Sequence, residues 1–579
     1  MPKYLENVIL LSMEFIKNIF KKLNGSTTGS AIVIAIFSIL SKLLGLLRDR
    51  LLAARFGAGD VLDAYYAAFK LPDFIFNTLV LGALSAAFIP LFIELKARHS
   101  HKNSQEKNGN LPIEQTEDEL IISSSAPARA LNNMNGSSFN HWDLSAAVIN
   151  VISLVLIVLG AVVWLFAPQF VTLIAPGFSG AKMALTVQMT KIMLISVLFF
   201  GISNVFSGIL QSLRKFTVFS LAPLMYNLGI IFGLVFLVNI FGDLGLAYGV
   251  VLGAFLHLII QWPAVRRAGF HWQSILALKN KAVRQIGKLM LPRTVGLAGN
   301  QLNQVITTII ASGLISGSLA IFNLASNLGS VPISIFAVSL AVATFPSLSE
   351  SFIQKDKAGF IAQISLNVRR ILYLMIPISV FMIALRAQIV RLVLGSGSFD
   401  WEDTILTADS LGYFAISLFA QGLIPLLARA FYAFQNTKIP VIISLIAVVL
   451  NIIGSVVLAP IMGVTGLALA FSLASIVNVV LLIVILRHKL GDLQEKKIVL
   501  AIIKICVSAI GGLVFIQLAK YGVANLVGTE TFLAILLQFI SAFVVGTAVF
   551  VLVSIALGSE ETLDVRNYLF KRSKKINYE

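Results

Sequence analysis

The sequence predicts an all-α integral membrane protein with about fourteen transmembrane helices, arranged as two six-helix lobes in a parallel repeat plus two C-terminal helices. Three observations lead to this fold class. Of the 579 residues, 58% are hydrophobic and 12% are charged, about half of the roughly 25% charged residues that soluble domains carry. Apolar runs of about 20 residues, enough to cross a hydrocarbon layer of about 30 Å, recur along the whole chain. The loops between these runs alternate in charge.

The apolar runs define the individual spans, and a mean hydropathy of +0.91 agrees with their frequency. We expect spans at approximately 29–55, 64–95, 144–167, 184–212, 217–240, 244–265, 288–313, 318–348, 368–390, 406–433, 439–460, 464–487, 496–519 and 531–556.

Basic residues collect in every second loop. The loops after the even-numbered spans contain Lys96, Arg214, Arg266, Lys355, Lys438 and Arg487, whereas the loops 56–60, 242–245, 312–318 and 460–463 contain no Lys or Arg. Arg386 and Arg391, after the ninth span, are the exception. Cytoplasmic loops carry the excess of Lys and Arg, so both termini should be cytoplasmic. The same bias accounts for the net charge of +17, and no nucleic-acid partner is expected.

Three segments lie outside the spans. Residues 1–24 have apolar side chains at helical spacing and several lysines, which is typical of an amphipathic helix on the membrane surface; a frayed tail is the alternative. Residues 99–141 form a polar insertion of low apolar content that we expect to be a disordered cytoplasmic loop, with a protein-docking role as the alternative. Residues 559–579 form a basic cytoplasmic tail.

Internal repetition predicts the domain organisation. The string Gly-Asp-Leu-Gly-Leu-Ala at 242–247 recurs as Gly-Val-Thr-Gly-Leu-Ala at 463–468. Ala-Phe-Ile-Pro at 87–90 similarly resembles Ala-Thr-Phe-Pro at 343–346. We therefore expect an N-lobe over 25–270, a C-lobe over 271–490 and two further spans over 491–558. Repeated lobes are how many secondary transporters build a central site that opens to each side in turn.

Several charged side chains fall inside the predicted spans. Lys42, Arg48 and Asp49 lie in the first span, and Asp63 and Asp73 lie in the second. A charge at mid-bilayer costs about 2.5–3.5 kcal/mol or more, so such residues usually face a water-filled cavity or one another. The cationic groups favour an anionic ligand. The alternative to ligand binding is a structural ion pair between Arg48 and Asp49. For amides such as Asn327, the alternative is interhelical hydrogen bonding.

The sequence contains no motif typical of an enzyme. It has no phosphate-binding loop ending in Gly-Lys-Ser or Gly-Lys-Thr, no His-Glu-x-x-His and no Cys/His cluster, and its only cysteine is Cys506. We therefore expect a transporter with no catalytic residues, no metal and no cofactor. An ion gradient, the membrane potential or the substrate gradient must supply the energy.

The first two spans resemble a known family. The strings 41–49 (Ser-Lys-Leu-Leu-Gly-Leu-Leu-Arg-Asp), 54–60 (Ala-Arg-Phe-Gly-Ala-Gly-Asp), 68–72 (Ala-Phe-Lys-Leu-Pro) and 82–90 are similar to the opening of the MurJ/MviN family. Its members are lipid II flippases of the MOP exporter superfamily. The resemblance extends along the chain through Ala-Pro-Gly-Phe at 175–178, Phe-Pro-Ser-Leu at 345–348 and Arg-Ala-Phe-Tyr at 429–432.

This resemblance implies a transporter with a cationic cavity between its lobes and a lipid-tail groove on its last two helices. Arg48, Asp49 and Asp63 match the family pattern, and Lys42 stands where the family usually has Arg. Asp73 stands where the family has Asn. Phe76 and Asn77 occupy the positions of the family's next two arginines, and Leu81 occupies the position of its Glu. In the eighth span, Asn327 occupies the position of the family's cavity Arg before a proline. The implied substrate-binding set is Lys42, Arg48, Asp49, Asp63, Asp73, Asn77 and Asn327.

The expected function is translocation of undecaprenyl-diphosphate-linked peptidoglycan precursor from the inner to the outer leaflet of the bacterial plasma membrane by alternating access. Its partners would be this lipid-linked glycan, membrane lipids and cell-wall synthesis proteins. The alternatives are a transporter of another lipid-linked oligosaccharide, an ion-coupled exporter of the same superfamily, and a non-transporting envelope scaffold.

Overall fold

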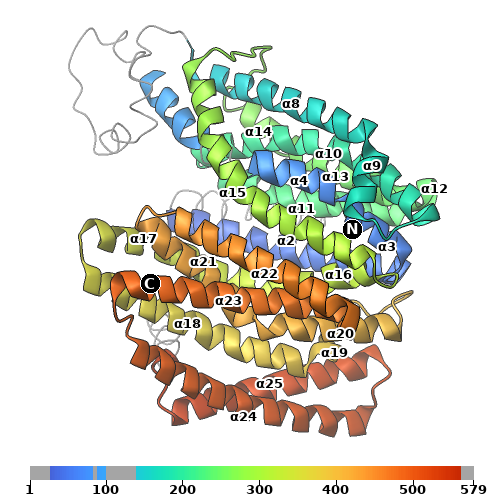
Figure 1. The fold of residues 1–579 in the computed structure, drawn as a ribbon, viewed down its shortest axis with the longest axis vertical. Coiled ribbons are helices and arrows are strands. Elements are labelled where there is room, and N and C mark those ends of the chain that lie inside the picture. The colour runs from blue at the N-terminus through green and yellow to red at the C-terminus, as the bar shows by residue number, and fades with distance from the viewer. Residues whose placement is uncertain (1–26, 82–87, 100–138, 563–579) are drawn as a thin grey trace, which may run out of the picture. The chain divides into compact units, whose positions relative to one another are not determined.

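The computed structural model describes residues 27–81, 88–99 and 139–562 (Figure 1). All regular secondary structure in these ranges is helical, which confirms the predicted all-α class. The N-terminal segment 1–24, almost all of the insertion 99–141 and most of the tail 559–579 lie outside the described residues.

Many of the helices are long and apolar enough to cross a bilayer, so the chain is a multi-pass membrane protein. The described residues contain nine such helices, or ten if the bent pair Trp401–Ile416 and Leu418–Ala433 forms one span. This count takes Phe216–Arg266 as one stretch and does not include the helices that begin at Thr27 and Lys281. The predicted number of fourteen therefore stays a prediction.

The chain packs as two compact units. Unit 1 comprises residues 1–48, 67–174 and 178–302, and unit 2 comprises residues 49–66, 175–177 and 303–579. The boundary therefore falls inside the first long helix, between Arg48 and Asp49, and inside the helix that contains Leu302 and Asn303. The predicted lobes were defined by the sequence repeat rather than by packing, and their boundaries remain a prediction.

Unit 1 is built mainly from the first half of the described helices. They are α2 (Thr27–Phe56), α4 (Lys70–Phe76), the π-helix η1 (Asn77–Leu81), α8 (His141–Leu165), α9 (Ala167–Ile174), α10 (Gly180–Ser212), α11 (Phe216–Phe232), the π-helix η2 (Gly233–Leu237), α12 (Val238–Phe241), the 3-10 helix η3 (Gly242–Leu244), α13 (Gly245–Ile259), α14 (Trp262–Arg266) and α15 (Lys281–Ser312). Its apolar core lies between α8, α10 and the helical residues 88–99, with Phe92 and Phe206 almost fully buried.

Glycines bring two helices of unit 1 into close contact. A β-carbon at Gly229 of α11 would lie 2.3 Å from the Cα of Gly253 in α13, and one at Gly233 of η2 would lie 2.3 Å from the Cα of Gly249. Small residues allow helix backbones to approach in a membrane, where no hydrophobic effect drives helices together. These glycines therefore fix the α11–α13 packing.

Unit 2 contains the remaining helices. They are α3 (Asp60–Ala68), α16 (Ser318–Pro332), the π-helix η4 (Ile333–Ala337), α17 (Val338–Ile353), α18 (Lys357–Ala384), α19 (Arg386–Val393), α20 (Trp401–Ile416), α21 (Leu418–Ala433), α22 (Lys438–Met462), α23 (Val464–Leu490), α24 (Glu495–Val527) and α25 (Phe532–Ala556). Its core lies between α18, α21, α23 and α24, and α25 packs along α24 (Figure 1).

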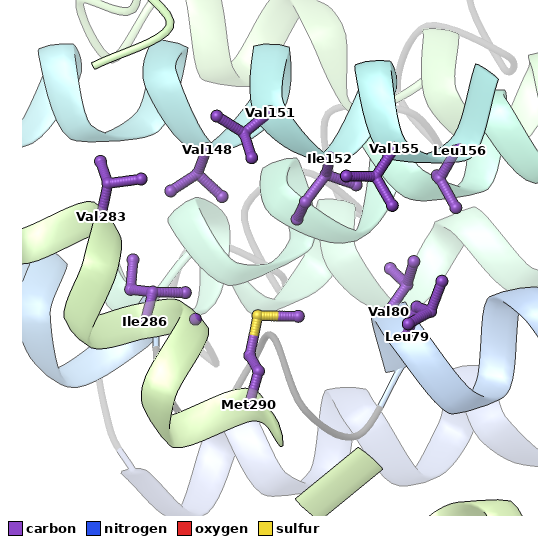
Figure 2. A pocket seen from close by; sticks show the side chains of 11 residues that line it. Leu79, Val80, Val148, Val151, Ile152, Val155, Leu156, Val283, Ile286 and Met290 are labelled. Carbon is purple, nitrogen blue, oxygen red and sulfur yellow. The ribbon is translucent and has the colours of Figure 1, made fainter. Parts of the chain in front are cut away.

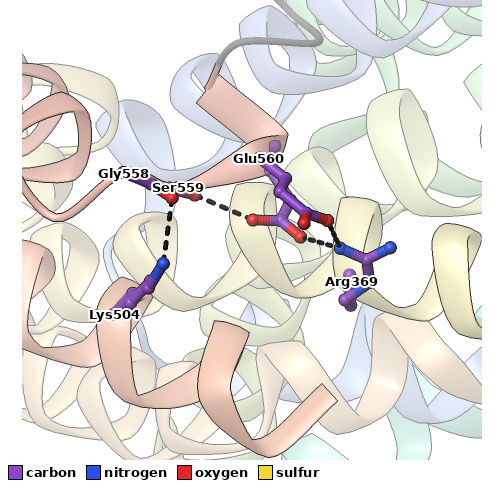
Figure 3. Close-up of polar contacts among 6 residues, drawn as sticks. Arg369, Lys504, Gly558, Ser559 and Glu560 are labelled. Atoms are coloured by element: carbon purple, nitrogen blue, oxygen red, sulfur yellow. Dashed lines mark hydrogen bonds and ion pairs between the residues drawn. The ribbon is translucent and has the colours of Figure 1, made fainter. Parts of the chain in front are cut away.

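The chain end after α25 is fastened to α18 and α24. The buried Arg369 of α18 donates to Glu561 at 2.7 Å and to Glu560 at 2.9 Å. Lys504 of α24 donates to the carbonyl oxygen of Gly558 at 2.9 Å (Figure 3). The Arg369 contacts thus tie the chain end to α18, and the Lys504 contact ties it to α24.

Two π-helical turns occur at equivalent places in the sequence repeat. The interval from Asn77, where η1 begins, to Ala87 of the first repeated string equals the interval from Ile333, where η4 begins, to Ala343 of the second. A π-turn inserts an extra residue into a helix and is frequently found at functional sites. The local backbone geometry thus follows the repeat that the sequence predicts.

Candidate functional site

The cationic part of the candidate site lies on α2 in unit 1. Arg48 is half-buried and donates from Nη1 to Oδ1 of Asn227 on α11 at 3.2 Å. The amide of Asn227 in turn donates to the backbone oxygen and the hydroxyl of Ser41, each at 3.3 Å. An arginine carries its donors in a planar fork, and the bond to Asn227 helps to orient this guanidinium.

Lys42 follows Ser41 on α2, and its side chain is exposed. It is an ammonium in the apolar part of a helix whose neighbours Leu43 and Leu47 are 56% and 45% exposed. A cation on such a helix is expensive in hydrocarbon unless water or an anion reaches it. Lys42 and Arg48 are therefore two cationic groups on one helix of one unit.

Polar groups of the second predicted span also lie in unit 1. Asp73 on α4 is exposed. Asn77, at the start of η1, donates to Gln301 of α15 at 3.5 Å. The π-turn begins at Asn77, so this side chain lies where the backbone departs from the regular helix.

Asp49 belongs to unit 2 and is only 3% exposed. Its Oδ2 accepts a hydrogen bond of 3.0 Å from the amide of Asn327 on α16. Bonds to an ionised acceptor are stronger than neutral ones. Two candidate residues that are far apart in sequence are thus joined directly.

Asp63 is 2% exposed and serves the N-terminus of α16. Its two carboxylate oxygens accept from the backbone N–H groups of Gly317 and Ala320, each at 2.8 Å. The first N–H groups of a helix have no partner inside the helix, and its N-terminus attracts negative charge. Asp63 therefore acts as a capping group supplied from another helix, which sequence analysis did not foresee.

The structure links Asp49, Asn327 and Asp63 through α16. Arg48 is joined to Asn227, whereas Lys42 shares only the helix α2 with it. Asp73 and Asn77 lie on the consecutive elements α4 and η1. Sequence analysis missed the contacts made by Asn227, Ser41 and Gln301. The only sequence signal for Asn227 is an amide in an otherwise apolar span.

No group of three or more His, Cys, Asp or Glu side chains that could hold a metal ion occurs within residues 27–81, 88–99 and 139–562. What the charged set offers chemically is binding, with two cations on α2 for an anionic group.

Comparison with known proteins gives the family. The model of the family "Lipid II flippase MurJ" matches residues 52–109 and 132–543. A probable lipid II flippase MurJ of Rickettsia prowazekii (strain Madrid E) is 28% identical over 545 residues, which covers 93% of this chain and 98% of that protein. The lipid II flippase MurJ of Burkholderia cenocepacia is 27% identical over 464 residues, or 78% of this chain and 82% of that protein.

Solved structures agree on the fold. A lipid II flippase MurJ in an inward closed conformation superposes with a TM-score of 0.71 at 24% identity, covering 90% of this chain and 98% of that one. An inward-facing multidrug resistance MATE transporter of the MOP superfamily gives a TM-score of 0.58 at 15% identity, with 80% and 99% covered. The family model extends over well more than half of the sequence, and on this ground the chain belongs to the lipid II flippase MurJ family.

Proposed function

We propose that this protein is a lipid II flippase, which moves undecaprenyl-diphosphate-linked peptidoglycan precursor from the inner to the outer leaflet of the bacterial inner membrane. The observation that carries the proposal is the pair of cations on α2, an exposed Lys42 and a half-buried Arg48, in a multi-pass protein of the MurJ family. A diphosphate crossing hydrocarbon needs such partners, because an unpaired charge there is prohibitively costly. Alternating access of two lobes would carry the head group across.

In this proposal Lys42 and Arg48 hold the diphosphate. Arg48 offers a planar fork that Asn227 orients, and Lys42 offers a point charge. Asp73, Asn77 and Asn327 are polar groups for the sugar and peptide. Asp49 and Asp63 are positioning residues, since their oxygens bond to Asn327 and to the start of α16.

Complementation tests the proposal. The parent chain, expressed in a bacterium depleted of its own lipid II flippase, should restore growth, whereas Arg48→Ala at equal abundance should not. A charge-assisted hydrogen bond contributes about 1.5–3 kcal/mol, which corresponds to a fall in flipping rate of roughly tenfold or more. Arg48→Lys keeps the charge without the fork and should rescue partially.

Lys191→Ala is the matched control. Lys191 is also a cation within a predicted span of unit 1, but its Nζ lies over the ring of Trp164, 4.6 Å from the centroid. We expect this variant to rescue like the parent. If an abundant, membrane-inserted parent failed to restore growth, the lipid II assignment would be wrong and another lipid-linked substrate would be favoured. Full rescue by Arg48→Ala would instead remove the cationic site from the mechanism.

A further inference from the structure

An apolar pocket lies inside unit 1. It occupies about 150 Å³ between α8, η1 and α15. Figure 2 shows Val148 and Val155 on α8 facing Ile286 and Met290 on α15, with Val80 of η1 at one end. Among the described residues, every lining side chain is aliphatic or methionine, apart from Gly287, which has none.

The size and lining of the pocket define the kind of molecule it can hold. An engineered protein cavity of about 150 Å³ lined by similar residues stays dry and binds benzene or xenon, since water finds no polar partners in it. This pocket therefore suits a short length of hydrocarbon. In a membrane protein the hydrocarbon at hand is the acyl chain of a bilayer lipid.

The α8 wall of the pocket continues onto the outer surface of the helix. Val155 lines the pocket and is 42% exposed, and its neighbours Leu154 and Val158 are 47% and 54% exposed. A chain lying along this apolar stripe of α8 can enter the pocket without crossing a polar surface.

Two cations lie on the exposed face of α15, in the stretch of the helix that lines the pocket. Arg284 and Lys288 are exposed and four residues apart, so they share a face of α15. Arg284 also lies one turn before Gly287, which borders the pocket. Neither cation forms an ion pair within the described part of the chain. Basic groups near the ends of membrane helices attract the head groups of anionic lipids.

We propose that this is a binding site for an anionic phospholipid, with one acyl chain in the α8–η1–α15 pocket and the phosphate at Arg284 and Lys288. The lipid would be a resident of the membrane and not the transported molecule. Because the pocket joins three elements, a bound chain would also hold η1 and α15 against α8.

Gly287 provides the means to close the pocket. A β-carbon there meets no atom within 4 Å, so a larger side chain has room at this position beside the cavity. Gly160 on α8 is the matched control, since a β-carbon there also meets nothing within 4 Å and Gly160 does not line the pocket. Gly287→Leu and Gly160→Leu thus add the same side chain inside and outside the site.

The test uses the full chain in nanodiscs that contain phosphatidylglycerol with a photoactivatable diazirine near the end of one acyl chain. After irradiation, mass spectrometry should find the label on α8 and α15 residues that line the pocket. Gly287→Leu should reduce this labelling at least fivefold and Gly287→Ala by less, while Gly160→Leu should leave it unchanged. Gel filtration and thermal unfolding show which variants are folded.

Charge is tested separately. Arg284→Gln with Lys288→Gln should lower labelling by the phosphatidylglycerol probe severalfold, whereas Arg266→Gln with Arg267→Gln, another basic pair of unit 1, should not. A phosphatidylcholine probe should label the parent less. Equal labelling by both probes, undiminished labelling of folded Gly287→Leu, or displacement of the probe by a polyprenyl diphosphate would each overturn the proposal. These readouts do not depend on flipping, so they remain informative if the proposed function fails.

Discussion

At the scale of single residues, the charged side chains of the first two predicted spans differ in what surrounds them. Lys42 and Asp73 are exposed on helices of unit 1, whereas Asp49 and Asp63 are almost completely buried in unit 2. A buried carboxylate is tolerated when hydrogen-bond donors satisfy it, and both have such donors. We therefore separate exposed charges, which can meet a ligand, from buried ones, which shape the protein.

Asp63 provides a prediction at this scale. Asp63→Ala leaves the N–H groups of Gly317 and Ala320 without their acceptor, and an unsatisfied buried group costs about 1–3 kcal/mol. We expect a lower midpoint of thermal unfolding in detergent. Asp60→Ala is the comparison, because Asp60 is exposed and accepts from Ser316 at 2.6 Å. An equal loss in both variants would contradict the capping role of Asp63.

At the scale of elements, one buried cation of α18 binds the chain end that follows α25. The side chain of Arg369 is 10% exposed, and its two acidic partners differ greatly: Glu561 is 4% exposed and Glu560 is 73% exposed. Removing one partner of a buried ion pair leaves an uncompensated charge, whereas an exposed pair contributes little.

Two adjacent glutamates therefore make a matched pair of variants. Glu561→Ala should destabilise unit 2 by about 3–5 kcal/mol, because Arg369 loses its buried partner. Glu560→Ala should cost about 0–1 kcal/mol. Thermal unfolding of the purified chain, followed by circular dichroism, measures both. If Glu560→Ala were the more damaging change, Glu561 would not be the residue that anchors the chain end.

Sequence patterns predicted the helices but not the π-helical turns within them. Apolar runs predicted helices at the right places because backbone groups in lipid must bond within the helix. Hydropathy could not predict the π-turns η1 and η4, since an extra residue in a helix leaves the apolar pattern almost unchanged. The repeat became visible in these turns only once the backbone was known.

At the scale of the whole molecule, the alternating basic loops predict an orientation with both termini cytoplasmic. The chain has one cysteine, the half-buried Cys506, so Cys506→Ala gives a cysteine-free background. In this background a membrane-impermeant maleimide should label Ile315→Cys in intact spheroplasts. It should label Lys357→Cys only after permeabilisation. Both positions are exposed. The reverse labelling pattern would invert the proposed topology.

The sequence by itself determined that most of this protein lies in a bilayer, that it is all-helical and that it contains an internal repeat. It also showed a resemblance to one family along most of the chain. These properties follow from local composition and short strings: apolar length selects a bilayer, and loop charge selects a side. The sequence also identified Lys42, Arg48, Asp49 and Asp63 as unusual, because a charged side chain in an apolar run is energetically costly unless a partner or water compensates it.

Only the tertiary structure showed which groups the two buried carboxylates contact. Asn327 contacts Asp49, and the start of α16 contacts Asp63, across more than 250 residues of sequence. The division of α2 between two units and the pocket beside Gly287 likewise depend on which helices pack together. Such contacts arise when distant segments pack together. The apolar periodicity of a helix shows which face is apolar, but it does not show which helix packs against that face.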